Sequence, residues 1–278
     1  MIQTFKMAFR DLGRNRRRSF FSSLALGIGL ALLLLMAGFF QGEMRGAMND
    51  SIRLQSGHLQ VRAKSYDETK TSLAWTDLIA DPNQVAAQVA AIPQVLLATP
   101  RLFATGIIGT SDQSIGVRII GIDPASAANA PYRDGMVAGT FLTADDRNGV
   151  LMGKALADKL GLKSGDTIDL LANTSNGDVD EQVFTIRGVY DTHTPGFDQS
   201  ALFLPLAKAQ ALTRTENHAS TIFVLLKNID QTQAVASALQ GSQYTVSTYI
   251  QLNQIISDTE QLANSYIYML YLIVLAIT

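Results

Sequence analysis

The hydrophobic positions form one long run near the N-terminus and shorter periodic runs after it. Residues 20–40 read FFSSLALGIGLALLLLMAGFF, and no charged residue follows Arg18 until Glu43. An α-helix rises about 1.5 Å per residue, so this run is long enough to cross the roughly 30 Å hydrocarbon layer of a bilayer. It is longer than the apolar part of a secretory signal and does not end in a small-residue cleavage pattern. We therefore predict an uncleaved membrane span at residues 19–42.

Four arginines stand directly before this span, namely Arg14, Arg16, Arg17 and Arg18. Basic residues that flank a span are retained on the cytoplasmic side of the membrane. We therefore expect a cytoplasmic N-terminus, with residues 43–263 in the periplasm or the extracellular space. Within residues 1–18 the apolar positions share one helical face, which predicts an amphipathic helix in the cytoplasmic headgroup layer. A short unstructured basic tail is the alternative.

The predicted span carries small residues at every fourth position. These are Ser23, Gly27 and Ala31, which lie one above another on a helix. Small residues at this spacing let two helices approach closely in lipid. We interpret them as a helix-packing face, although such a stripe also arises by chance.

The shorter runs predict an α+β domain at residues 43–263. Its first part, about 56–123, is predicted as a strand, a polar irregular stretch at 64–80, a helix and two long strands. Its last part, about 216–251, is predicted as a strand, a helix and a strand at 244–251. Two such halves make a ferredoxin-like layer. The segment between them, about 124–215, alternates turn-rich stretches with strands and is predicted as an inserted, β-rich subdomain.

The C-terminal stretch is again helical and apolar. Residues 252–265 return to helical periodicity, and residues 265–278 contain no charged side chain. These uncharged residues are too few to span a bilayer. We predict that residues 264–278 begin a second, truncated membrane span, so that the chain is a fragment of a larger membrane protein. A terminal buried helix is the alternative.

The distribution of charge argues against nucleic-acid binding. The chain has 278 residues, with 22 Lys or Arg and 24 Asp or Glu. Six of the basic residues and one acidic residue fall in positions 1–18, so the remaining chain is acidic, with 16 against 23. A nucleic-acid-binding domain would carry a basic patch on its folded part. The absence of cysteine excludes disulfides and thiolate metal sites.

Motifs for catalysis are missing from the sequence. GVLMGKA at 149–155 has one residue too few between its glycines, and Ala where a phosphate loop needs a hydroxyl. Asp191, His193 and Asp198 could offer an imidazole and two carboxylates to a metal, but an ordinary solvated loop is the simpler interpretation. We therefore expect a non-catalytic chain, with no catalytic, cofactor-binding or metal-binding residue of its own.

Several motifs resemble the FtsX/MacB-like permeases of type VII ABC transporters. The longest is GVLMGKALADKLGLKSGDTIDL at 149–170, followed by VRIIGIDP at 117–124. SGHLQV at 56–61 and GFDQSALFLPLAKAQ at 196–210 are most similar to the lipoprotein-releasing, LolC/LolE-like branch. The resemblance covers nearly the whole chain. It implies a ferredoxin-like Porter layer (about 56–123 and 216–251) split by a Sabre subdomain (about 124–215).

The resemblance also implies partners and a function. It implies a multi-pass protein of the inner membrane that acts with a separate cytoplasmic ABC ATPase, which binds the ATP, and with a second permease copy or a homologous permease. The expected function is mechanotransmission, in which ATP hydrolysis moves the outer domain, for lipoprotein release or export of a lipoprotein or lipid cargo. Drug or peptide efflux and activation of cell-wall hydrolases remain open within the family. The alternative outside it is a membrane-anchored ligand-binding or sensor protein. The residues that contact the ATPase cannot be assigned in this chain.

Overall fold

The computed structural model describes residues 16–67, 73–109, 114–241 and 243–277. They divide into a helical unit, with residues 16–49 and 254–277, and an outer domain at residues 50–253. Most of the amphipathic helix predicted for residues 1–18, including Arg14, lies outside the described residues. The other three arginines of the basic cluster form the first turn of helix α2.

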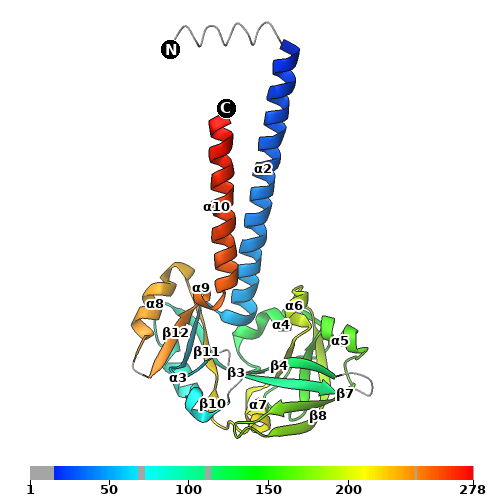
Figure 1. Ribbon diagram of the computed structural model, residues 1–278. Helices are drawn as coiled ribbons and strands as arrows, with labels where there is room; N and C mark the ends of the chain where they lie inside the picture. The colour runs from blue at the N-terminus through cyan, green and yellow to red at the C-terminus, as the bar shows by residue number, and fades with distance from the viewer. Residues whose placement is uncertain (1–15, 68–72, 110–113, 242, 278) are drawn as a thin grey trace. The chain divides into compact units, whose positions relative to one another are not determined.

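The helical unit contains α2 (Arg16–Ser51) and α10 (Gln254–Ile277) (Figure 1). Among the described residues, one helix, Arg16–Ser56, is long and apolar enough to cross a membrane. Gln41 Nε2 of α2 donates a hydrogen bond to Asn264 Oδ1 of α10 at 3.3 Å. The predicted packing face, Ser23, Gly27 and Ala31, is exposed within this chain.

Two strand–helix–strand units build the first part of the outer domain. The first is β1 (Leu59–Ala63), α3 (Pro82–Ala90) and β3 (Val95–Gly109). The second is β11 (Thr221–Leu226), η4 (Ile229–Gln231) with α8 (Thr232–Leu239), and β12 (Tyr244–Thr248). Their strands form an antiparallel sheet in the order β12-β1-β11-β3. The apolar faces of α3 and α8 pack on this sheet and bury its first core, which includes Val85, Val89, Val224, Val235 and Ile222.

Six strands of the domain close into a ring, which the sequence did not predict. The path runs β3-β4-β9-β6-β8-β7 and returns to β3, because β7 pairs with both β8 and β3. The new members are β4 (Ser114–Ile122), β6 (Gly149–Gly153), β7 (Thr167–Asn173), β8 (Val179–Tyr190) and β9 (Ala201–Pro205). Closing the ring leaves few unpaired strand edges. β3 belongs to both the ring and the four-stranded sheet, so the sheet is continuous across the boundary expected near residue 124.

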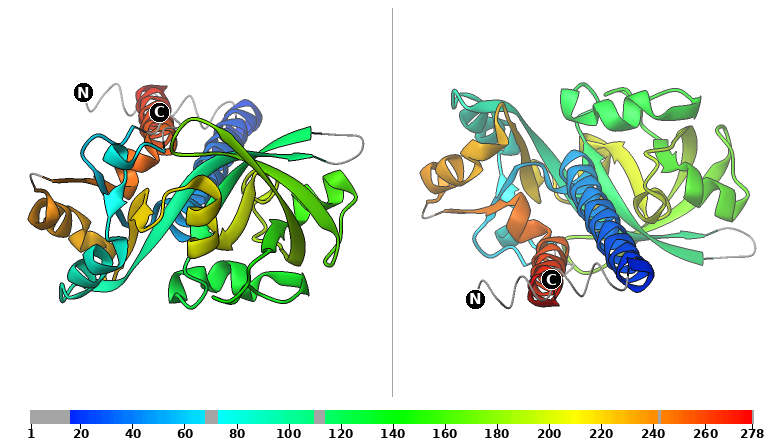
Figure 2. Two further views of the ribbon diagram at one scale, coloured as in Figure 1. Left: turned by 90° about the horizontal axis from the view of Figure 1, so that it is seen from below. Right: turned by 90° about the horizontal axis from the view of Figure 1, so that it is seen from above.

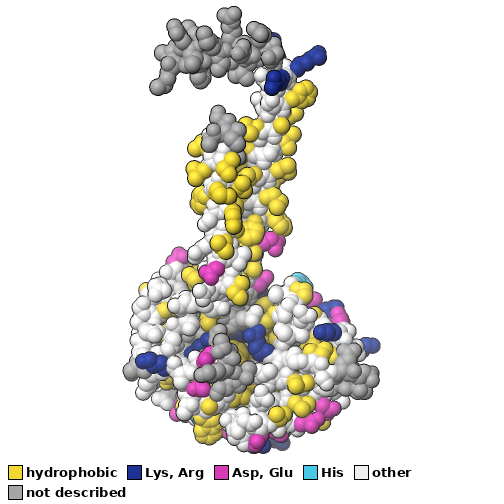
Figure 3. All heavy atoms as spheres, viewed as in Figure 1, with side chains coloured by type: hydrophobic (Ala, Val, Ile, Leu, Met, Phe, Trp, Pro, Cys, Tyr) yellow, Lys and Arg dark blue, Asp and Glu magenta, His cyan; other side chains and the backbone are white. Residues whose placement is uncertain are grey.

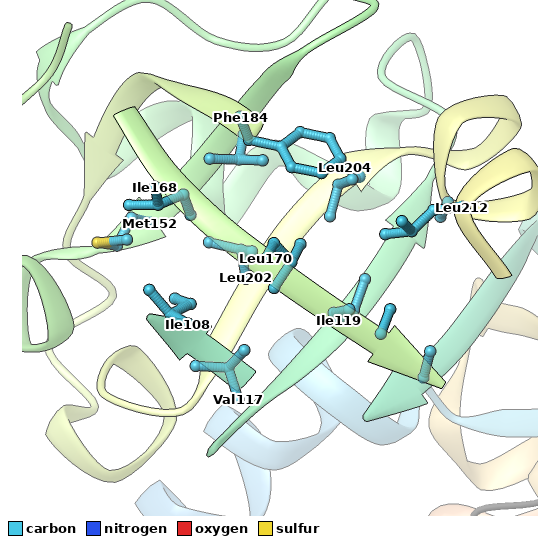
Figure 4. Packing of buried hydrophobic residues seen from close by; sticks show 14 of the residues in the cluster. Ile108, Val117, Ile119, Met152, Ile168, Leu170, Phe184, Leu202, Leu204 and Leu212 are labelled. Carbon is cyan, nitrogen blue, oxygen red and sulfur yellow. The ribbon is translucent and has the colours of Figure 1, made fainter. Parts of the chain in front are cut away.

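Alternate residues of the ring strands fill its interior. Buried side chains recur at every second position, as the two-residue period of a strand requires. Examples are Val117 and Ile119, Ile168 and Leu170, and Leu202 and Leu204. In Figure 4 these side chains point toward one another together with Ile108, Met152 and Phe184. Leu212 of α7 (Leu206–Thr213) joins the same core.

The remaining elements are short. They are η1 (Ile52–Ser56), η2 (Trp75–Asp77), β2 (Ile79–Ala80), η3 (Ala127–Asn129), α4 (Ala130–Asp134), β5 (Met136–Gly139), α5 (Lys154–Leu160), α6 (Pro195–Asp198), β10 (His218–Ala219) and α9 (Tyr249–Leu252). Figure 2 shows the outer domain from two further sides, with α3 and α8 at one end and α5 at the other.

Two stretches differ from the sequence-based expectation. The strand predicted for 244–251 ends at Thr248, whose hydroxyl accepts from Gln251 N while Gln251 Oε1 accepts from Thr248 N, a capping box that starts α9. The stretch 64–80, predicted to be irregular, contains η2 and a two-residue strand, β2, that pairs with β10.

Gly57 ends the turn that follows α2, and its backbone requires glycine. Its φ is +64°, and a Cβ there would lie 2.8 Å from Val224 O. Gly161 ends α5 at a similar φ of +69°, but no atom lies within 4 Å of its Cβ position.

We expect Gly161→Ala to cost about 1 kcal/mol of unfolding free energy, and Gly57→Ala at least about 3 kcal/mol, because only the latter adds a clash with the backbone. Urea unfolding of the chain in detergent, followed by circular dichroism, measures both. Equal losses would show that the backbone conformation alone sets the cost.

Candidate functional site at the root of the long helix

Both connections to the helical unit leave the outer domain from neighbouring strands. Two residues separate the end of η1 from the start of β1, and β12 leads directly into α9. The two strands pair antiparallel from Leu59 opposite Thr248 to Ala63 opposite Tyr244. We call residues 51–56 and 248–253 the helix root. A force applied through either connection therefore reaches the same pair of strands.

Side chains join the two halves of the root. The amide of Asn253 accepts a hydrogen bond from Ser51 Oγ and donates through Nδ2 to Ser56 Oγ at 3.2 Å. The same nitrogen lies 2.7 Å from Tyr249 O. Tyr249 N in turn donates to His58 O at 3.0 Å, directly after the first half. One side chain thus bridges both connections.

The carbonyl of Leu54 accepts two hydrogen bonds from buried side chains. Arg101 Nη1 of β3 donates to Leu54 O at 3.0 Å, and the hydroxyl of Tyr132 in α4 donates to the same oxygen. The last carbonyls of a helix have no partner within the helix, and its C-terminal end attracts cations. Arg101 therefore acts as a buried cap at the end of this long helix. Burial lowers the pKa of Arg101 and raises that of Tyr132.

Aromatic rings hold Tyr132 in place. Its ring centroid lies 4.3 Å from that of Phe203 and 5.7 Å from that of Tyr190. Phe197 stacks on the same ring at 6.0 Å. Leu54 is buried in this cluster, on the outer face of the ring strands. The root is therefore fixed to the ring of strands as well as to the four-stranded sheet.

A cavity of about 300 Å³ opens beside the root. Side chains from η1, β1, β3 and β4 line it, including Gln55, Arg62, Arg101 and Arg118. The described residues that line it include no aspartate or glutamate. Figure 3 shows a hollow in the outer domain with Lys or Arg side chains inside it.

The loop that the sequence singled out contains two hydrogen-bonded pairs, Asp191 with His193 and Asp198 with Thr192, and the two carboxyl groups also interact with each other. Asp191 Oδ1 accepts from the backbone of His193 at 2.8 Å and lies 3.0 Å from its Nδ1. Asp198 is 2% exposed, and its two oxygens accept from the backbone and the hydroxyl of Thr192. Both oxygens of Asp198 therefore anchor the loop. Among the described residues, no group of three or more His, Asp or Glu is placed to hold a metal.

Sequence reasoning missed the residues that build the root. Arg101 interrupts a long apolar strand, and Asn253 directly precedes the apolar terminal helix. A lone charge in an otherwise buried strand was the available signal for Arg101. Nothing local marked Tyr132, which lies 78 residues from the carbonyl that it contacts. The orientation and packing residues predicted from sequence, Arg16–Arg18 and Ser23–Ala31, lie on α2 outside the root.

The described chain thus combines one helix that is long and apolar enough to cross a membrane with an α+β domain. The family model of the MacB-like periplasmic core domain matches residues 19–242, and the chain belongs to this family, whose domain occurs in ABC-type transporter permeases.

Two solved structures are similar to the chain. The periplasmic region of MacB from Actinobacillus actinomycetemcomitans is 14% identical, with a TM-score of 0.49, over 76% of this chain and 97% of that one. The extracellular domain of the noncanonic ABC-type transporter YknZ from Gram-positive bacteria is 13% identical, with a TM-score of 0.46, over 68% of this chain and 99% of that one.

The Asp191–His193 pair gives a pH-dependent prediction. The hydrogen bond to Asp191 raises the pKa of His193, whereas burial lowers the pKa of His58. The pair therefore stabilises the folded chain below the unfolded histidine pKa, and this contribution is lost as the pH rises through the folded pKa. We expect Asp191→Asn to lower the pKa of His193 and leave that of His58 unchanged. NMR titration of labelled histidine measures both. A His193 pKa that does not respond to Asp191→Asn would contradict the pairing.

Proposed function

We propose that this chain is a permease subunit of an ABC transporter. In this proposal a separate cytoplasmic ATPase hydrolyses ATP, and the resulting helix motion moves the outer domain through α2 and α10. The chain itself is non-catalytic and carries no cofactor. Membership of the MacB-like family supports the assignment of the chain to the permeases of ABC transporters.

The observation that carries the mechanism is the joined helix root. A chain that is only anchored needs one covalent connection to its membrane helix. Here two connections leave from paired strands and are bridged by Asn253, and Arg101 caps the first of them at Leu54. Such an arrangement resists independent movement of the two connections, so a displacement is transmitted to the whole domain.

Asn253→Ala tests this transmission. The variant loses the bonds to Ser51 and Ser56, each worth roughly 1 kcal/mol, so we expect transport per ATP hydrolysed to fall about fivefold while hydrolysis continues. The measurement uses the full-length protein with its co-purified ATPase in reconstituted vesicles. Asn228→Ala is the matched control, because Asn228 caps η4 away from the root through a bond to Asp230 N. Equal transport per ATP hydrolysed in the unmodified protein, Asn253→Ala and Asn228→Ala would exclude a role of the root in transmission.

A sensor or ligand-binding protein is the alternative. Such a protein would use its helices only as anchors and would not need an ATPase. Affinity purification from mild detergent separates the two. Recovery of an ABC ATPase in stoichiometric amounts supports the permease, and its reproducible absence supports the sensor.

The finer placement in the membrane is part of the proposal. We infer a multi-pass inner-membrane protein with a cytoplasmic N-terminus, in which α10 begins a second span. The arginine cluster supports this orientation. A reporter that is active only in the periplasm should work when fused at Asn173 and be silent when fused at Lys6. In the same proposal the four-stranded sheet with α3 and α8 is the Porter layer, and the ring strands outside β3 and β4 belong to the Sabre subdomain.

For the cargo we propose a lipoprotein or lipid, as in the LolC/LolE-like branch. The motifs at 56–61 and 196–210 support this choice over drug efflux and activation of cell-wall hydrolases. Release of a labelled lipoprotein from vesicles that contain the permease and its ATPase is the direct test. ATP-dependent export of a drug, without lipoprotein release, would instead indicate that the chain is an efflux permease.

The small-residue face of α2 supports a second permease copy or a homologous permease as partner. Outside the local backbone of α2, no described atom lies within 4 Å of a Cβ placed at Gly27 or Gly29, so the described residues leave room for a larger side chain at either position. We expect Gly27→Leu to disrupt pairing with a neighbouring helix and lower transport per ATP hydrolysed. Gly29→Leu lies about 200° around the helix and should have a milder effect. Equal behaviour of the two variants, in the vesicle assay and in crosslinking of two copies, would exclude this packing face.

A further inference from the structure

Arg101 is a buried cation that uses only part of its hydrogen-bonding capacity. Its side chain is 1% exposed and stacks on the ring of Phe223, with 3.7 Å between its Cζ and the ring centroid. Its Nη1 donates to Leu54 O, but its Nε and Nη2 have no hydrogen-bond partner among the described residues. A buried charge is strongly disfavoured unless it is paired and hydrogen-bonded. The end of the long helix therefore supplies only part of the compensation that Arg101 requires.

The two unused nitrogens lie on one edge of the guanidinium. Such an edge is a planar fork of donors, and it matches the two oxygens of a carboxylate. Arg62 shows the same geometry in the same cavity, since its Nε and Nη2 both donate to Gln60 Oε1, at 3.0 and 2.6 Å. We call Nε and Nη2 of Arg101 the unused edge.

A second unsatisfied atom lies on the same face of β3. Thr99 is 5% exposed, and its Oγ1 also has no hydrogen-bond partner among the described residues. Residues two apart on a strand share a face, so Thr99 and Arg101 point to the same side of the sheet. α3 and α8 cover the opposite side, through residues such as Ile222 and Val224. Buried polar atoms are normally satisfied, so this side of the sheet has the character of an unfilled polar site.

We propose that the cavity beside the helix root binds a small carboxylate-bearing molecule, with its carboxylate on the unused edge of Arg101. Arg101 lines this cavity, whose volume of about 300 Å³ lies at the lower end of the range for ligand pockets. The described residues that line it supply no carboxylate of their own. One carboxylate neutralises one guanidinium, so the site requires no other cation. Leu54, Phe103, Ile120 and Leu252 also line the cavity and offer apolar contacts to a short hydrocarbon part.

This ligand would act on the cap of the long helix. Arg101 holds Leu54 O through its third nitrogen, so a carboxylate on the unused edge fixes the guanidinium in its capping position. A hydrogen bond between opposite charges is stronger in such a buried place than in water. Binding would therefore stiffen the helix root. The proposal does not depend on the transport function, because it concerns binding by the folded outer domain alone.

The test is thermal unfolding of the whole chain in neutral detergent, with hexanoate titrated against chloride at constant ionic strength. A ligand that binds only the folded state raises the melting temperature in a saturable manner. We expect this rise for the unmodified chain, and an apparent affinity at least tenfold weaker for hexanamide, which is similar in size but uncharged. Arg101→Lys keeps the charge but loses the two-donor edge, so it should weaken hexanoate binding at least tenfold.

Two threonine variants test the place of binding without altering the helix cap. Thr105 lines the cavity and is exposed, so Thr105→Trp narrows the cavity at a position that tolerates a large side chain. We expect it to weaken hexanoate binding at least tenfold. Thr185→Trp is the matched control, because Thr185 is an exposed residue of β8 that does not line the cavity, and its affinity should stay within twofold. This pair decides the question even if Arg101→Lys does not fold.

Three outcomes overturn the proposal. The first is the lack of a saturable rise with hexanoate in the unmodified chain. The second is an equal response to hexanamide, which would show that the hydrocarbon part and not the charge stabilises the chain. The third is unchanged affinity in a folded Arg101→Lys variant, or equal affinity in Thr105→Trp and Thr185→Trp, which would place the binding outside the cavity.

Discussion

The structure depends on how the long apolar helix ends. A helix of this length finishes with several carbonyl groups that no residue of the helix can satisfy, and here they lie inside a folded domain rather than in water. Arg101 and Tyr132 satisfy Leu54 O, and the amide of Gln60 satisfies Gln55 O at 3.0 Å. These donors come from β3, α4 and β1. The helix end is therefore satisfied only when all three elements are folded around it.

This dependence explains why the outer domain is built as one continuous sheet. β3 pairs with β11 through its first half and with β7 through its last residues, so it belongs to both parts of the domain. Arg101 lies opposite Thr221, at the end of the β11 pairing nearest to the β7 pairing. A displacement of the helix end therefore acts on the strand shared by both parts, and the two parts respond together. The bridge through Asn253 extends the same argument to the second connection.

The sequence predicted local features well and distant ones poorly. The two strand–helix–strand units follow from hydrophobic periodicity and from local signals such as Pro82 at the start of α3. The strand was predicted to continue to residue 251, because residues 244–251 are rich in side chains that favour strands. The capping box at Thr248 instead ends β12 and starts α9. The ring could not be predicted, because it depends on contacts such as Gly106 opposite Ala172 and the parallel pairing of β4 with β9. For the site, periodicity identified the residues of α2 but could not show that Arg101 reaches Leu54, 47 residues away.

The longest family motif, at 149–170, is best understood through the geometry of the ring. It covers β6, α5 and most of β7, and its apolar positions, such as Met152 and Ile168, fill the interior of the ring. Gly153 is required because a Cβ there would lie 2.0 Å from Asp198 O. That contact also places Asp198, the carboxylate that anchors the loop before β9. A motif that fixes strand contacts rather than a catalytic group fits the proposed transmission of force, because stiffness depends on packing throughout the domain and not on one reactive side chain.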